Sequence, residues 1–126
     1  MKILLLGALV AGTISVAAQA KSEATGEISY PKGSIGYEAL MRGDNARAIS
    51  QIITSEQVSK HDPAKLLNLG RAYARMGMTE QAAGYFKAAM QVRESVELVL
   101  ADGRVMDSKV AARAAYANLQ RRVATR

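Results

Sequence analysis

The chain has 126 residues and a formal net charge of +6; 49% of its residues are hydrophobic and 22% are charged, a balance that predicts one small folded domain. Only 5% of the residues are aromatic, and alanine and leucine dominate the apolar set, which favours helices over sheets. The chain contains no cysteine, which excludes a disulfide framework, a thiolate nucleophile, a zinc site with thiolate ligands and a lipidated N-terminal cysteine.

Residues 1–20 have the pattern of a secretory signal peptide. Lys2 gives a basic start, residues 3–18 are largely apolar, and Ala18-Gln19-Ala20 is a small-x-small cleavage site. An uncleaved membrane anchor is the alternative, but the apolar run is short for a spanning helix and contains two glycines. We therefore expect cleavage after Ala20 and a periplasmic location for the mature chain.

Residues 21–33 contain serine, threonine, glycine and proline without a helical period, and they predict a flexible leader. A first helix is expected over residues 34–42, with Ser34 as its cap and Gly43 closing it in a left-handed conformation. Asp44 can cap a second helix, from Asn45 to about Ile53. The expected apolar side of this second helix is formed by Ala48, Ile49, Ile52 and Ile53.

A second helical pair is expected between Pro63 and Met90, after a polar connector over residues 55–61. Asp62 is a good N-cap, and Pro63 suits the first helical position. Thr79 is the expected cap of the second helix of this pair.

The two helical pairs are in register at a spacing of 34 residues. Matched residues at this spacing are Gly36 and Gly70, Gly43 and Gly77, Ala48 and Ala82, Ile35 and Leu69, and Ile52 and Phe86. Closely packed helices need a residue without a bulky side chain at their crossing, so we expect Gly36 to face Ala48 and Gly70 to face Ala82. Gly43 and Gly77 allow the chain to reverse at the turn between the two helices of each pair.

This pattern resembles that of tetratricopeptide repeat proteins, over residues 34–92. The matching signature positions are Gly36, Gly43, Ala48, Leu69, Gly70, Tyr73, Gly77, Ala82, Phe86 and Ala89, supported by Leu66. The resemblance implies an all-α fold in which two helix–turn–helix repeats form a short right-handed solenoid. It also implies a non-enzymatic protein that takes a peptide or a partner helix in the groove lined by the first helix of each repeat.

By resemblance, the groove would be lined by Tyr37, Met41, Asn68, Arg71 and Arg75, together with Gly33, Leu40, Leu67 and Ala74. Some family members hold a peptide carboxylate with lysine and asparagine side chains, but only Asn68 stands at such a position here, so this clamp is not expected. Arg71 and Arg75 lie one turn apart and either meet an acidic partner or remain solvated.

The pattern changes over residues 93–107, where aliphatic residues flank Asp102-Gly103. This stretch predicts either a short β-hairpin or irregular turn, or a helix that continues the preceding one or begins a new one. Asp107-Ser108 then caps a last helix, from Lys109 to about Ala124, which would cover the open end of the second repeat. Its expected apolar stripe is formed by Val110, Ala114, Leu119 and Val123, with Ala111 and Ala115 beside it, and residues 108–126 end in a basic tail.

No constellation of catalytic, metal-ligating or phosphate-binding residues is recognised. His61 is the single histidine and is expected at the surface, and the glycines are spaced for packing rather than for a phosphate loop. We therefore expect no cofactor, no metal, no nucleic acid and no enzymatic activity, but a protein or peptide partner bound in the groove. The alternative is a peripheral envelope protein whose basic last helix docks to an anionic membrane or partner. The open edge of only two repeats can also be covered by a second copy.

Overall fold

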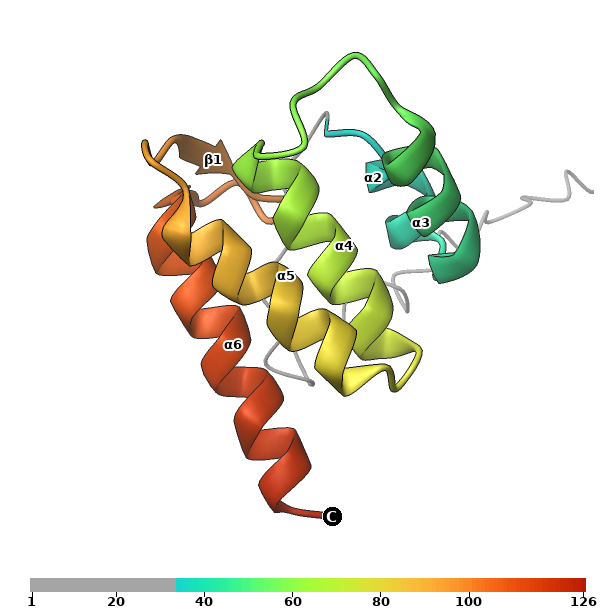
Figure 1. Cartoon of the computed structure of the whole chain (residues 1–126), viewed down its shortest axis with the longest axis vertical. Coiled ribbons are helices and arrows are strands. Elements are labelled where there is room, and N and C mark those ends of the chain that lie inside the picture. The colour runs from blue at the N-terminus through green and yellow to red at the C-terminus, as the bar shows by residue number, and fades with distance from the viewer. Residues whose placement is uncertain (1–33) are drawn as a thin grey trace, which may run out of the picture.

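The computed structural model describes residues 34–126, so the expected signal peptide and leader lie outside the described residues. The elements are the helices α2 (Tyr37–Met41), α3 (Asn45–Thr54), α4 (Pro63–Arg75) and α5 (Thr79–Gln91), the strands β1 (Glu97–Val99) and β2 (Val105–Asp107), and the helix α6 (Ser108–Ala124). Figure 1 shows the helices side by side in a row that ends at α6, with the small hairpin at one end of α4, α5 and α6. The predicted helical fold is confirmed, and the hairpin is the correct alternative for residues 93–107.

The first helical pair is shorter at its start than predicted. Gly36 has a φ of 80°, a left-handed conformation, so α2 begins at Tyr37 rather than at Ser34. Gly43, with a φ of 77°, reverses the chain as expected, and Asp44 caps α3 by accepting a 3.1 Å hydrogen bond from the Arg47 N–H. Ala48 and Ile52 face the core, but Ile53 is 54% exposed and does not belong to the apolar side.

The second helical pair begins as the sequence predicts. The Asp62 carboxylate accepts a 2.8 Å hydrogen bond from the Lys65 N–H, and Pro63 occupies the first turn of α4. The predicted cap Thr79 is instead the first residue of α5, and Met78 is the N-cap residue without a side-chain hydrogen bond. The left-handed turn at Gly77 is followed by Met78 and then by α5, so the helix starts one residue earlier than expected. The Thr79 hydroxyl donates to the Gly77 carbonyl at 3.5 Å instead of capping the helix.

The two pairs make the same close contact at positions 34 residues apart. A Cβ atom on Gly36 would lie 2.7 Å from Ile52 Cδ1, and a Cβ atom on Gly70 would overlap the ring of Phe86. The expected partners Ala48 and Ala82 are fully buried, and a Cβ atom on Gly36 would also lie 3.3 Å from the Ala48 carbonyl oxygen, as expected for that pair. The closest approach, however, is to the side chains of Ile52 and Phe86. The larger side chains of the second helices therefore fill the space that the glycines leave.

Tyr73 and Tyr85 join the two halves of the core. Their rings stack with centroids 5.5 Å apart, and both contact the cluster around Ile52 as well as the cluster around Phe86. Partial burial, and then the neighbouring Tyr73, raise the pKa of the Tyr85 hydroxyl. The apolar core is therefore continuous from α2 to α6.

The hairpin rests on the core by one face. Leu98 and Leu100 are buried, and β1 and β2 pair antiparallel with Val99 opposite Val105. Ser108, which is fully buried, connects this hairpin to α6: its hydroxyl accepts a 3.1 Å hydrogen bond from the Val96 N–H, and its own N–H donates to the Val96 carbonyl at 2.8 Å.

This connection determines which side of α6 faces the core. With Ser108 pointing inward, the buried face continues through Ala111, Ala112, Ala115 and Leu119. The predicted stripe is therefore wrong in part, because Val110 and Val123 are exposed. The cap is correct: the Asp107 carboxylate accepts hydrogen bonds from the N–H groups of Lys109 (2.8 Å) and Val110 (3.1 Å).

The Asp107 cap predicts a pH dependence of stability. A hydrogen bond from the Ser95 side chain, followed by the bond from the Val110 N–H, lowers the pKa of this carboxyl below its ordinary value of 3.8. Because the folded-state pKa is the lower one, the stabilisation is present above the ordinary value and is lost as the pH falls through the folded-state value. Urea unfolding at neutral and acidic pH should show a larger acid-induced loss for the native protein than for Asp107→Asn. Equal losses would contradict this role.

Candidate functional site

The side of α4 that faces the first helical pair carries a row of polar side chains. The Asn68 amide donates to the Ser34 hydroxyl at 2.7 Å and to the Ile35 carbonyl at 3.2 Å. Lys65 Nζ donates to the carbonyl of Ser55 at 3.2 Å, and an Arg75 guanidinium nitrogen donates to the Leu40 carbonyl at 2.9 Å. These bonds connect α4 to the backbone before α2, within α2 and after α3.

Two residues of this row, Asn68 and Arg75, were predicted to line a binding groove, as was Arg71 of the same helix, and the structure changes the interpretation of all three. Asn68 is 0% exposed and Arg71 is 4% exposed, so neither presents a free surface, and a solvated Arg71 is excluded. Arg75 is half-buried and bonded to α2. The sequence could not reveal this, because helical spacing places these residues on one face without saying that the backbone around α2 lies against it.

The accessible part of the face lies toward the end where the helices turn. Tyr37 is half-buried, and Met41 is 42% exposed. Arg75 is bonded to Leu40, and the residues that follow these two in the chain, Met41 and Met76, are both exposed. Flexible thioether side chains adapt to apolar partners of different shapes, so this end can receive another protein.

Asn68 also retains an unused acceptor. Its Oδ1 atom is buried and has no hydrogen-bond partner among the described residues. Such an acceptor costs free energy unless a donor reaches it.

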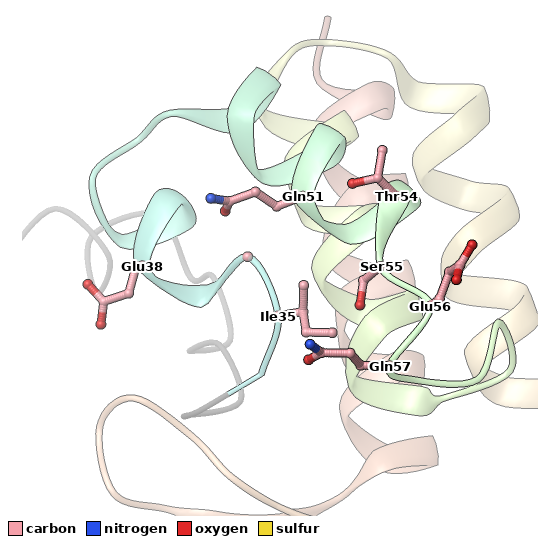
Figure 2. A pocket seen from close by; sticks show the side chains of 8 residues that line it. Ile35, Glu38, Gln51, Thr54, Ser55, Glu56 and Gln57 are labelled. Atoms are coloured by element: carbon pink, nitrogen blue, oxygen red, sulfur yellow. The ribbon is translucent and has the colours of Figure 1, made fainter.

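A second concave region, which the sequence did not indicate, lies between α2 and the end of α3. The hollow has a volume of about 650 Å³, and its lining consists of Ile35, Gly36, Glu38, Gln51, Thr54, Ser55, Glu56 and Gln57. Figure 2 shows Gln57 beside Ile35, whereas Glu38 and Glu56 point away from the centre. Glu38 pairs with Arg42 at 3.4 Å on the surface. The two carboxylates are therefore not arranged as an acid–base pair.

The described residues contain no group of three or more histidine, cysteine, aspartate or glutamate side chains that could hold a metal ion. His61 lies exposed in the connector, where its backbone N–H donates to the Ser59 hydroxyl at 3.2 Å. Within residues 34–126, no helix is both long and apolar enough to cross a membrane. No protein family, curated protein or solved structure matches this chain.

Proposed function

We propose that this protein is a non-enzymatic helical-repeat module that binds a protein or peptide partner in the periplasm. The observation that carries the proposal is the repeated contact: Gly36 with Ile52, and Gly70 with Phe86, at an offset of 34 residues. Two tetratricopeptide repeats with α6 as their cap would account for this offset, for the left-handed turns at Gly43 and Gly77, and for the buried alanines at positions 48 and 82.

The partner would contact the face shared by α2 and α4 at its accessible end. Tyr37, Met41 and Arg75 would supply the contacts, and the exposed Met76 would extend them toward the turn. Asn68 and Arg71 support the face from within rather than touching the partner. A charge reversal at Arg71 would consequently test folding instead of binding, because it would bury a carboxylate.

Replacing Met41 by glutamate is expected to weaken capture of the partner at least about tenfold, because a charge would have to be desolvated at the contact. Ile53→Glu is the matched control, since both positions carry a large exposed apolar side chain but Ile53 lies on α3 rather than on α2 or α4. Cross-linking in the periplasm followed by quantitative mass spectrometry would measure both. Equal recovery of the partner by the two variants would overturn the proposed binding face.

A further inference from the structure

The first helical pair, α2 and α3 with residues 34–36 before them, has only a small apolar contact with α4. The buried apolar residues at this contact are Ala39, Leu40, Ala48 and Ile52 of the pair and Leu69 and Ala72 of α4. Half of this cluster is alanine, whose side chain removes little apolar surface from water. Within residues 34–126, no residue of the pair belongs to the cluster around Phe86, which holds α4, α5, the hairpin and α6 together.

Polar contacts account for much of the remaining interface between this pair and α4. Lys65, Asn68 and Arg75 of α4 donate to oxygen atoms on the other side, and the acceptors belong to Ser34, Ile35, Leu40 and Ser55. When the two surfaces separate, each of these bonds is exchanged for a bond to water. The net contribution of the polar contacts to holding the pair in place is therefore small.

The closed interface also contains features that cost free energy. Asn45 Oδ1, at the start of α3, and Asn68 Oδ1, on α4, are buried without a hydrogen-bond partner among the described residues. Water reaches both acceptors once the pair leaves α4 and unfolds, so opening removes a cost that the closed form carries. The hollow of about 650 Å³ between α2 and the end of α3 lies in the same pair, so these two helices do not fill the space between them.

The connection to α4 allows the pair to leave without disturbing the rest of the fold. Residues 55–62 separate α3 from α4, and most of this connector is exposed. The first turn of α4 has its own cap, because the Asp62 carboxylate accepts a 2.8 Å hydrogen bond from the Lys65 N–H. The hairpin is bonded to α6 through Val96 and Ser108, independently of the first pair.

We infer that residues 34–54 open from α4 as one cooperative unit while α4, α5, the hairpin and α6 remain folded. α2 has 5 residues and α3 has 10, and isolated helices shorter than about 12 residues are marginal in water. Neither helix therefore persists once its contact with α4 is lost. Ile52 of α3 fills the space at Gly36 before α2, and this contact makes the two helices open together.

Opening takes apart the proposed binding face, a consequence that rests on the proposed function. Tyr37 and Met41 lie on α2, whereas Arg75 lies on α4, so only the closed form presents all three. A partner that contacts both helices stabilises the closed form, and its apparent affinity depends on the fraction of the protein that is closed.

The test is amide hydrogen exchange of the purified protein, followed by NMR over a series of low denaturant concentrations. The amides of Leu40 and Ala48, which donate to the carbonyls of Gly36 and Asp44, report on α2 and α3. They should share one protection factor, at least about tenfold smaller than that of the buried amides of α5 and α6. The measurement needs no partner, so its result is independent of whether the proposed binding face is correct.

Ile52→Val, a mild change of a buried side chain, should lower the protection of residues 37–54 by about two- to tenfold and leave α5 and α6 unchanged. Ile53→Val is the matched control, and because Ile53 is 54% exposed it should have no measurable effect on either part. Equal protection of the first pair and of α5 and α6 would overturn the inference, as would an equal effect of Ile52→Val on both parts. Different protection factors for α2 and α3 would also overturn it, because they would indicate separate fraying of the two helices.

Discussion

Replacing Phe86 by alanine is expected to lower the free energy of unfolding by about 3–5 kcal/mol, the largest effect of any single change considered for this protein. Phe86 is almost completely buried, lies against Gly70 of α4, and belongs to the cluster that joins α4, α5, the hairpin and α6. Removing the ring loses the free energy gained by burying it and leaves a cavity that the backbone cannot close. A small domain is stable by only about 5–15 kcal/mol, so this loss would partly unfold the protein at physiological temperature.

Urea unfolding followed by circular dichroism would measure the effect. Ile53→Ala provides the control, because the same class of change at a position that is 54% exposed should alter stability by less than about 0.5 kcal/mol. Equal effects of the two substitutions would contradict the packing described for α5.

Replacing Gly70 by alanine is expected to destabilise the protein by about 1–3 kcal/mol, the usual cost of adding a methyl group to a filled core. Helix propensity alone predicts the opposite sign, because alanine is about 1 kcal/mol better than glycine inside a helix. The clash should prevail, since the new Cβ would overlap the Phe86 ring.

The same contact provides a sharper test in a double-mutant cycle. With Phe86→Ala already present, Gly70→Ala should become neutral or stabilising, because the space needed by the methyl group is then empty. Gly84→Ala, at an exposed position of α5 with no described atom within 4 Å of its Cβ, should stabilise the protein by about 0.5–1 kcal/mol. Destabilisation by Gly70→Ala that persists unchanged without the ring would exclude the proposed contact.

Several features followed from the sequence because their causes are local. Three helices are capped by the aspartate that directly precedes them, Asp44, Asp62 and Asp107. An aspartate at this position can accept hydrogen bonds from the N–H groups of the first turn, which have no partner within the helix. The turns at Gly43 and Gly77 need a left-handed residue, which glycine adopts without steric cost. Thr79 is a suitable N-cap residue by type, but the turn before it decides where α5 begins, so that Met78 is the N-cap residue and Thr79 the first residue of the helix.

The candidate site shows the opposite case, because its properties depend on contacts between elements distant in sequence. Asn68, Arg71 and Arg75 have the spacing of a binding face, and only the packing of the other elements against α4 reveals that two of them are buried and that Arg75 is bonded to α2. The hollow lined by Gln51 and Gln57 carried no sequence signal, since polar residues at a helix end and in a connector are ordinary surface residues.

By itself, the sequence determined the order of the helices, the caps of α3, α4 and α6, the turns at Gly43 and Gly77, and the 34-residue register, because each depends on residues within a few turns of one another or on a simple period. It left hairpin and helix open for residues 93–107, and its expected caps Ser34 and Thr79 are not the N-cap residues of α2 and α5. The tertiary structure alone decided the start of α2, the partners of Gly36 and Gly70, and the face of α6 that is buried. The reason is that the rotation of a helix follows from what it packs against: Ser108, held by Val96, turns Val110 outward although the helical period alone allows it to face the core.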